Sequence, residues 1–137
     1  MRLNPNDVNI TIDYANCLTY MGRFDEALQY LDKAMQRNPF PPTWIWEVRG
    51  QVLLQSKRYE EAIGALQNLP VQNYFSHGVK AAAYAWAGQT DNARREVVMA
   101  LAIKPDFKVS VFGQYPWVHE IHRTHILDGL RMAGLPE

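Results

Sequence analysis

Two segments of the chain carry equivalent residues at the same spacing, and this repeat constrains the fold more than any other feature. In residues 22–39 a glycine is followed five positions later by alanine, then after four by an aliphatic residue, after three by alanine and after five by proline. Residues 88–105 repeat every interval, and residues 59–66 hold a partial third copy. Repeats of about 34 residues are typical of stacked helix pairs. The sequence therefore predicts an all-α solenoid, a class that mostly binds other molecules.

The repeat divides residues 1–105 into about three helix pairs, which we place at residues 7–39, 42–70 and 72–105. Asp7 is a suitable N-cap for the first helix. Gly22 and Gly88 are expected to end the first helices of their pairs, because glycine adopts the left-handed cap conformation at little cost. Pro70 is expected to end the second helix of the middle pair early.

Both ends of the chain depart from these three pairs. Residues 2–5 resemble residues 37–39, which close the first pair, so we expect the chain to be the carboxy-terminal piece of a longer array. Residues 106–137 lack the pattern and are expected to form capping helices. Within them we predict a short helix near residues 107–112, a turn at 115–117 and a final helix over 118–133, ended by Gly134.

Charge and hydropathy argue against two classes of partner. Fourteen basic residues balance fourteen acidic ones, whereas nucleic-acid binders usually carry a basic excess, so we expect no nucleic-acid partner. No apolar run approaches the ~20 residues that span a bilayer, and residues 1–7 lack a signal sequence, so we expect no membrane association. The single cysteine, Cys17, lies beside Leu18. We interpret it as a buried thiol in a reducing cytoplasm.

Two copies of the repeat carry a recognisable set of residues: Trp46, Gly50, Tyr59 and Ala62 in one, and Tyr84, Gly88, Ala93, Ala100 and Pro105 in the other. This pattern resembles the tetratricopeptide repeat, over about residues 7–105. The resemblance implies a right-handed superhelix of three helix pairs, with a role in protein–protein interaction. The middle copy departs from the pattern, because Lys57 stands where a small residue is usual.

The tail of the chain carries a second resemblance. Residues 127–137, with the preceding residues 104–107 and 115–116, are similar to the carboxy termini of certain bacterial signalling proteins. Those proteins join an adenylate-cyclase or winged-helix regulator domain to tetratricopeptide repeats. The resemblance implies a bacterial cytoplasmic signalling or regulatory parent, although no cyclase catalytic residues are present in these 137 residues.

The candidate binding surface is the concave groove, which the first helix of each pair should line. With the register set by positions 22, 57 and 88, the inward side chains are a mixed polar and aromatic set: Asn9, Ile12, Asn16, Thr19, Trp44, Glu47, Gln51, Phe75, Gly78 and Ala82. Such a surface suits a protein or peptide ligand. The alternative is that Trp44 and Phe75 pack locally or against a neighbouring chain.

Trp44 and Trp46 should face different ways, because residues two apart on a helix differ by ~200° in direction. Trp46 matches the packing tryptophan of the family, so we expect it in the core. Trp44 is then left for the groove, near Phe75.

Some tetratricopeptide repeat proteins hold acidic peptide tails with a carboxylate clamp of Lys, Arg and Asn side chains. Asn16 fits one clamp position, but the other positions supply no cations: Ile12, Val48, Phe75 and Val79. We therefore do not expect that class of ligand.

His119, His122 and His125 offer an alternative function, because histidines three residues apart on a helix can share a zinc ion. Their spacing departs from the His-Glu-x-x-His motif of zinc hydrolases. The last two also share a helix face with apolar residues, namely Val118, Ile121 and Met132. We therefore favour histidines that pack the final helix, and expect no metal.

A further alternative is a homo-oligomerisation module, in which apolar surface at the truncated amino-terminal end pairs two chains. The motifs of a phosphate-binding loop, a zinc-binding cysteine pair and a nucleophile elbow are absent from the sequence. The acidic pairs 25–26 and 60–61 begin predicted helices, where negative charge favours the helix dipole. We expect no catalytic residue, no cofactor and no enzymatic activity.

Overall fold

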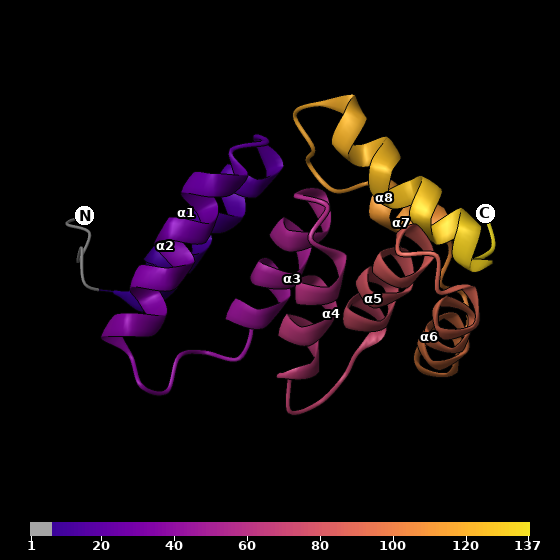
Figure 1. Cartoon of the computed structure of the whole chain (residues 1–137), viewed down its shortest axis with the longest axis horizontal. Helices are drawn as coiled ribbons and strands as arrows, with labels where there is room; N and C mark the ends of the chain where they lie inside the picture. Colours follow the sequence, from indigo (N-terminus) through magenta and orange to yellow (C-terminus); the bar gives the residue numbers. More distant parts are fainter. Residues whose placement is uncertain (1–6) are drawn as a thin grey trace.

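The computed structural model describes residues 7–137, so the predicted unit end at residues 2–5 lies outside the described residues. Residues 7–137 form eight helices and no strand (Figure 1). In order they are α1 (Val8–Tyr20), α2 (Phe24–Arg37), α3 (Ile45–Gln55), α4 (Tyr59–Gln67), α5 (Tyr74–Trp86), α6 (Thr90–Ile103), α7 (Val109–Gly113) and α8 (Glu120–Ala133). The predicted fold class, an all-α solenoid of three helix pairs with carboxy-terminal helices, is confirmed.

The turn inside each pair has the same backbone structure. The residue after the first helix's cap has a positive φ at Gly22 (83°), Lys57 (63°) and Gly88 (81°). In each turn the next backbone N–H donates to a carbonyl five residues back, at 2.9, 2.9 and 2.8 Å. This is the bond of the Schellman motif, which glycine favours. The repeat therefore imposes a left-handed conformation on a lysine in the middle pair.

Small residues allow the two helices of each pair to pack closely. The alanines at the fourth position of each second helix, Ala27, Ala62 and Ala93, are all fully buried. A Cβ added at Gly50 would lie 2.5 Å from Cγ of Leu66, so α3 and α4 approach closely at this position. The alanines and glycine of the repeat are therefore packing residues.

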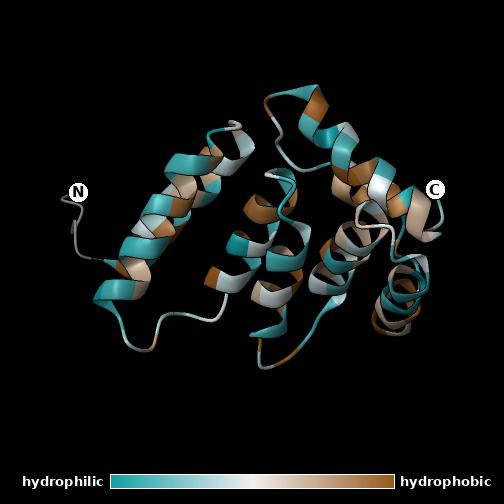
Figure 2. Ribbon diagram, in the orientation of Figure 1, coloured by the Kyte–Doolittle hydropathy of each residue, from teal (hydrophilic) through white to brown (hydrophobic). Residues whose placement is uncertain are grey.

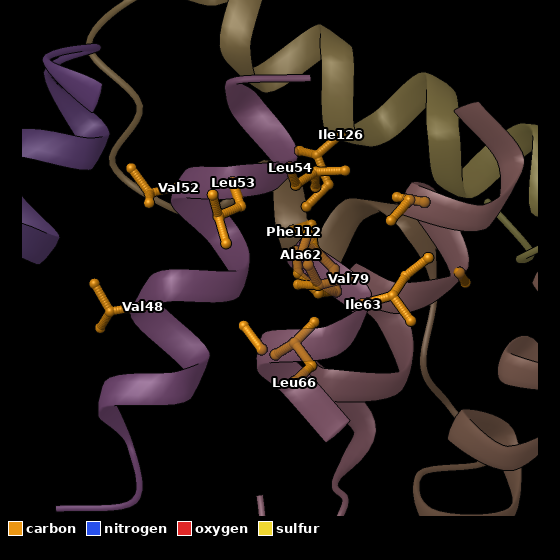
Figure 3. Packing of buried hydrophobic residues seen from close by; sticks show 14 of the residues in the cluster. Val48, Val52, Leu53, Leu54, Ala62, Ile63, Leu66, Val79, Phe112 and Ile126 are labelled. Atoms are coloured by element: carbon orange, nitrogen blue, oxygen red, sulfur yellow. The ribbon is translucent and has the colours of Figure 1, made fainter. Parts of the chain in front are cut away.

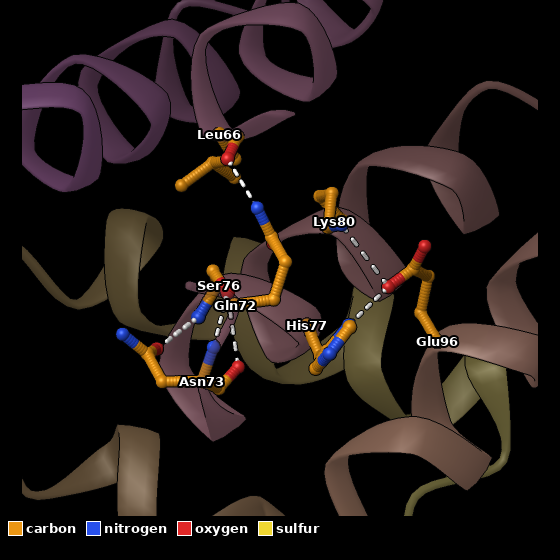
Figure 4. Close-up of polar contacts among 7 residues, drawn as sticks. All are labelled: Leu66, Gln72, Asn73, Ser76, His77, Lys80 and Glu96. Atoms are coloured by element: carbon orange, nitrogen blue, oxygen red, sulfur yellow. Dashed lines mark hydrogen bonds and ion pairs between the residues drawn. The ribbon is translucent and has the colours of Figure 1, made fainter. Parts of the chain in front are cut away.

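The middle pair is shortened as expected. Helix α4 has nine residues, whereas α2 and α6 each have 14. Asn73 then begins α5 with a capping box: its side chain accepts from the Ser76 N–H at 2.8 Å, and the Ser76 hydroxyl accepts from the Asn73 N–H at 2.9 Å (Figure 4). Such reciprocal bonds satisfy two free donors at a helix start.

The core is continuous through the molecule. Figure 2 shows hydrophilic and hydrophobic residues on the same helices, as expected for amphipathic helices that bury one face. In Figure 3, Phe112 and Ile126 of the carboxy-terminal segment lie beside Leu54, Ala62 and Val79 of the repeats. The carboxy-terminal helices therefore share one core with the helix pairs.

Helix α8 folds back over the turns of all three pairs. Its residue His122 packs against Phe24 after the first turn, with ring centroids 4.8 Å apart. His125 contacts the hydroxyl of Tyr59 after the second turn at 2.9 Å. Gly129 lies against Trp86 before the third turn, since an added Cβ would meet the indole at 2.8 Å. The final helix thus contacts every pair.

Two expectations about individual side chains are wrong. Cys17 is exposed although its chain neighbour Leu18 is buried, because the two side chains point to different faces of α1. The apolar residues expected to share the packed face of the final helix are also exposed: Val118, Ile121 and Met132.

A buried polar cluster joins α5 to α6. Nδ1 of His77 lies 2.6 Å from Oε2 of Glu96, and Nζ of Lys80 lies 3.5 Å from the same oxygen (Figure 4). All three side chains are buried. Because buried charges require partners, the cluster fixes the pairing of these two helices.

Candidate functional site

A pocket of about 460 Å³ opens between the first helices of the pairs. Helices α1 and α3, the start of α5 and the loop between α7 and α8 supply its lining: Asn16, Tyr20, Trp44, Glu47, Val48, Gln51, Asn73, Tyr74, Phe75 and Tyr115. We call it the α1–α3–α5 pocket.

Several residues predicted for the groove meet in this pocket. The predicted residues that line it are Asn16, Trp44, Glu47, Gln51 and Phe75. Asn9 lies at the edge, where its side-chain oxygen accepts a hydrogen bond from the indole N–H of Trp44 at 3.3 Å. The register of the repeat therefore brings together residues from three different helices.

Three predicted groove residues are instead fully buried: Ile12, Thr19 and Ala82. Ile12 belongs to the core cluster. The hydroxyl of Thr19 donates to the carbonyl of Ala15 at 2.9 Å, so it is satisfied within its own helix. Ala82 is covered by α8, because an added Cβ at Gly129 would meet its methyl group at 2.9 Å. These positions cannot contact a ligand in this structure.

The carboxy-terminal segment covers the inner face of α5. Phe112 stacks on Phe75 with ring centroids 5.6 Å apart. The same ring fills the space beside Gly78, where a Cβ would meet it at 2.8 Å. The open part of the predicted groove is therefore confined to α1, α3 and the first turn of α5.

The positions of Trp44 and Trp46 agree only in part with the prediction. Trp44 precedes the first residue of α3 and lines the α1–α3–α5 pocket with Phe75. Trp46 is only partly buried and borders a shallow surface pocket with Arg49 and Arg58. The core position at the start of α3 belongs to Ile45, which is fully buried. Trp46 packs against the core without being fully buried in it, so the prediction that it is a core residue holds only in part.

Five aromatic rings line the pocket, from Tyr20, Trp44, Tyr74, Phe75 and Tyr115. The ring centroid of Tyr115 lies 6.4 Å from that of Tyr20 and 6.1 Å from that of Phe75. Burial raises the pKa of Tyr115 to about 12. Burial also raises the pKa of Tyr20, although the Gln51 amide opposes the shift. Both phenols are therefore neutral at physiological pH.

Two polar groups give the pocket its chemical character. An oxygen of Glu47 accepts a hydrogen bond from the Asn73 side-chain amide at 2.8 Å, so the carboxylate is held in place. The side-chain N–H₂ of Gln51 is buried without a hydrogen-bond partner among residues 7–137. A buried donor left unpaired costs about 1–3 kcal/mol, and protein atoms cover this nitrogen, so it does not reach a ligand in this structure.

Five lining residues are absent from the predicted inward set, namely Tyr20, Val48, Asn73, Tyr74 and Tyr115. The helix-start pattern at Asn73 and Ser76 could have placed Asn73 at the entrance of α5. No local signal identifies Tyr115, because its position depends on how the carboxy-terminal segment folds back.

The histidine segment lies at a second pocket of about 410 Å³, beneath α8. Nδ1 of His125 lies 3.0 Å from the Gln55 side-chain oxygen, and Nε2 lies 2.9 Å from the Tyr59 hydroxyl. Because the Gln55 oxygen only accepts, Nδ1 carries the proton and Nε2 accepts from the tyrosine. Both ring nitrogens are therefore occupied. Within residues 7–137, no three His, Cys, Asp or Glu side chains are grouped to hold a metal ion.

Comparison with known proteins gives one family match. A tetratricopeptide repeat family model matches residues 12–41, which span most of α1 and all of α2. This match supports the tetratricopeptide repeat family. Such repeats are generally non-enzymatic scaffolds that bind protein partners. No curated protein and no solved structure matches the chain.

None of the helices in residues 7–137 combines the length and apolar character needed to cross a bilayer.

Proposed function

We propose that the chain is a protein–protein interaction scaffold that binds a peptide segment of its partner in the α1–α3–α5 pocket. The observation that carries this proposal is the pocket itself, where three helices bring together aromatic rings and polar groups. Aromatic side chains surrounded by polar groups are typical of the residues that dominate binding energy at interfaces. The resemblance of the tail further supports a bacterial cytoplasmic signalling or regulatory protein as the parent.

The lining residues suit an extended peptide. The half-buried Asn16 amide supplies both a donor and an acceptor for a peptide backbone. Trp44 and Phe75 supply apolar area to the lining of the pocket. Because the helices that carry these groups are packed on a common core, the surface is preformed, which lowers the entropic cost of binding.

The proposal is tested with a peptide selected from an unbiased displayed library on residues 1–137. Trp44→Ala should weaken binding of that peptide roughly tenfold or more, since truncating a central aromatic commonly costs over 1 kcal/mol. Phe40→Ala is the matched control, because Phe40 is 95% exposed and lies outside the pocket. Titration calorimetry measures both. Equal losses in the two variants, or no loss for Trp44→Ala, would contradict the proposal.

A further inference from the structure

The α1–α3–α5 pocket has an unbalanced charge. Its lining contains one carboxylate, Glu47, and five aromatic rings, but no lysine or arginine. The nearby cation Lys104 lies over the Tyr74 ring, with its nitrogen 5.6 Å from the centroid, and it pairs with Asp106 at 3.3 Å. It does not line the pocket and forms no ion pair with Glu47.

We propose that this pocket binds a cationic side chain, lysine or arginine, of the partner's peptide. This inference rests on the proposed function and specifies the chemistry that the site recognises. Aromatic faces attract a cation within about 6 Å of the ring centre. A carboxylate among them compensates the cost of removing that cation from water, which an aromatic wall alone does not.

The position of Glu47 supports this assignment. One oxygen is held by the Asn73 amide at 2.8 Å, which orients the carboxylate. The other oxygen has no hydrogen-bond or ion-pair partner within the described part of the chain, and the residue is partly buried. An oriented carboxylate with one free oxygen is a ready acceptor for an ammonium or guanidinium N–H.

The neighbouring groups complete the site. Tyr20 and Tyr115 remain neutral because burial raises the pKa of both phenols, so they present neutral ring faces and hydroxyls. An acidic side chain would meet the carboxylate of Glu47, and no lysine or arginine lines the pocket to offset the repulsion.

The test uses small probes on residues 1–137: N-acetyl amides of arginine, lysine, norleucine and glutamate. Binding is followed through the indole N–H resonance of Trp44 in ¹⁵N-labelled protein. The arginine and lysine amides should shift this resonance saturably, at concentrations at least about fivefold lower than the neutral norleucine amide. The glutamate amide should bind most weakly. Equal or tighter binding of norleucine amide overturns the proposal.

Glu47→Gln removes the charge and keeps the shape, so it should abolish the preference for arginine over norleucine amide. Glu60→Gln is the matched control, because Glu60 is an exposed glutamate outside the pocket. It should leave the preference unchanged, and circular dichroism confirms that both variants fold. An unchanged preference in Glu47→Gln overturns the cation site.

The library experiment separates this inference from the proposed function. Suppose that the selected peptides lose affinity for Trp44→Ala but carry no shared lysine or arginine. That result supports the scaffold function and overturns the cation site. Arginine-amide binding that depends on Glu47, without any peptide that depends on Trp44, supports the cation site and contradicts the scaffold function.

Discussion

At the scale of single residues, the turns show how the repeat determines backbone conformation. Gly22 and Gly88 were predicted as left-handed caps, and both have positive φ. Lys57 departs from the family pattern but was aligned with Gly22 and Gly88 in setting the register, and it takes the same conformation. The pairing of α3 with α4 therefore imposes on a lysine a backbone shape that costs a non-glycine residue about 1 kcal/mol or more.

Lys57→Gly should stabilise the protein by about 1 kcal/mol, because glycine adopts this conformation without a Cβ clash. Urea denaturation measures the change in the free energy of unfolding. Lys57→Ala is the control, since it removes the long side chain and keeps the Cβ. A gain in stability that is equal in both variants would show that the side chain, and not the backbone, is responsible.

The two glycine turns should differ in their tolerance of a methyl group. Gly88→Ala should cost about 1 kcal/mol from backbone strain alone, since nothing lies within 4 Å of an added Cβ. Gly22→Ala should cost more, because its Cβ would lie 2.7 Å from the His122 ring and displace it. Melting temperatures of the two variants test this order, which fails if Gly88→Ala is the more damaging change.

At the scale of helices, local signals predicted the repeat elements well. The cap at Asp7 is confirmed, since its side chain accepts from the Asn9 N–H at 2.9 Å. The early end of α4 follows from Pro70, and Gly134 ends α8 with a φ of 94°. These features depend on residues close in sequence. The packing of α7 and α8 depends on distant contacts, so the sequence predicted the helices but not the surface that they cover.

The histidines of α8 should make the free energy of unfolding fall in mild acid. Burial lowers the pKa of His122 and His125, and nearby positive charges, from His119 and from Lys57 respectively, lower them further. The unfolded chain, with histidine pKa values near ~6.5, therefore binds more protons in mild acid than the folded protein. The two histidines therefore do not reduce the free energy of unfolding above about pH 6.5, and they reduce it increasingly as the pH falls below that value.

We expect the melting temperature to fall between neutral pH and about pH 5.5, in part through these two histidines. The double variant His122→Phe, His125→Gln should show a smaller fall. His119→Gln should also show a slightly smaller fall than wild type, because it removes one charge that lowers the pKa of His122. A fall of the same size in the double variant and in wild type would exclude this contribution.

At the scale of the whole molecule, the carboxy-terminal segment decides how much of the groove is open. The repeat register placed Trp44, Glu47, Gln51 and Phe75 around one pocket. It could not show that Phe112 covers the inner face of α5, because residues 106–137 do not follow the repeat. The sequence thus predicted site residues that the repeats contribute. It did not predict those that residues 106–137 contribute.

Phe112→Ala should destabilise the protein by about 3–5 kcal/mol, as truncation of a buried phenylalanine typically does. Phe112 is fully buried and packs against Gly78 and Phe75. Phe40→Ala provides the matched control at a side chain that is 95% exposed, and its cost should be within about 0.5 kcal/mol of zero. Similar losses in the two variants by urea denaturation would contradict the packing described.

The passage of α8 over all three turns changes how the stack should come apart. In an ordinary solenoid each repeat touches only its neighbours, so terminal repeats can fray while the others persist. Here the amide of Val118 donates to the Tyr20 carbonyl at 2.9 Å, and His122 packs on Phe24, which ties the last segment to the first pair. Opening the first pair therefore disturbs the last helix. Amide exchange should be slowed to a similar degree in all three pairs, so the stack behaves as a single cooperative unit.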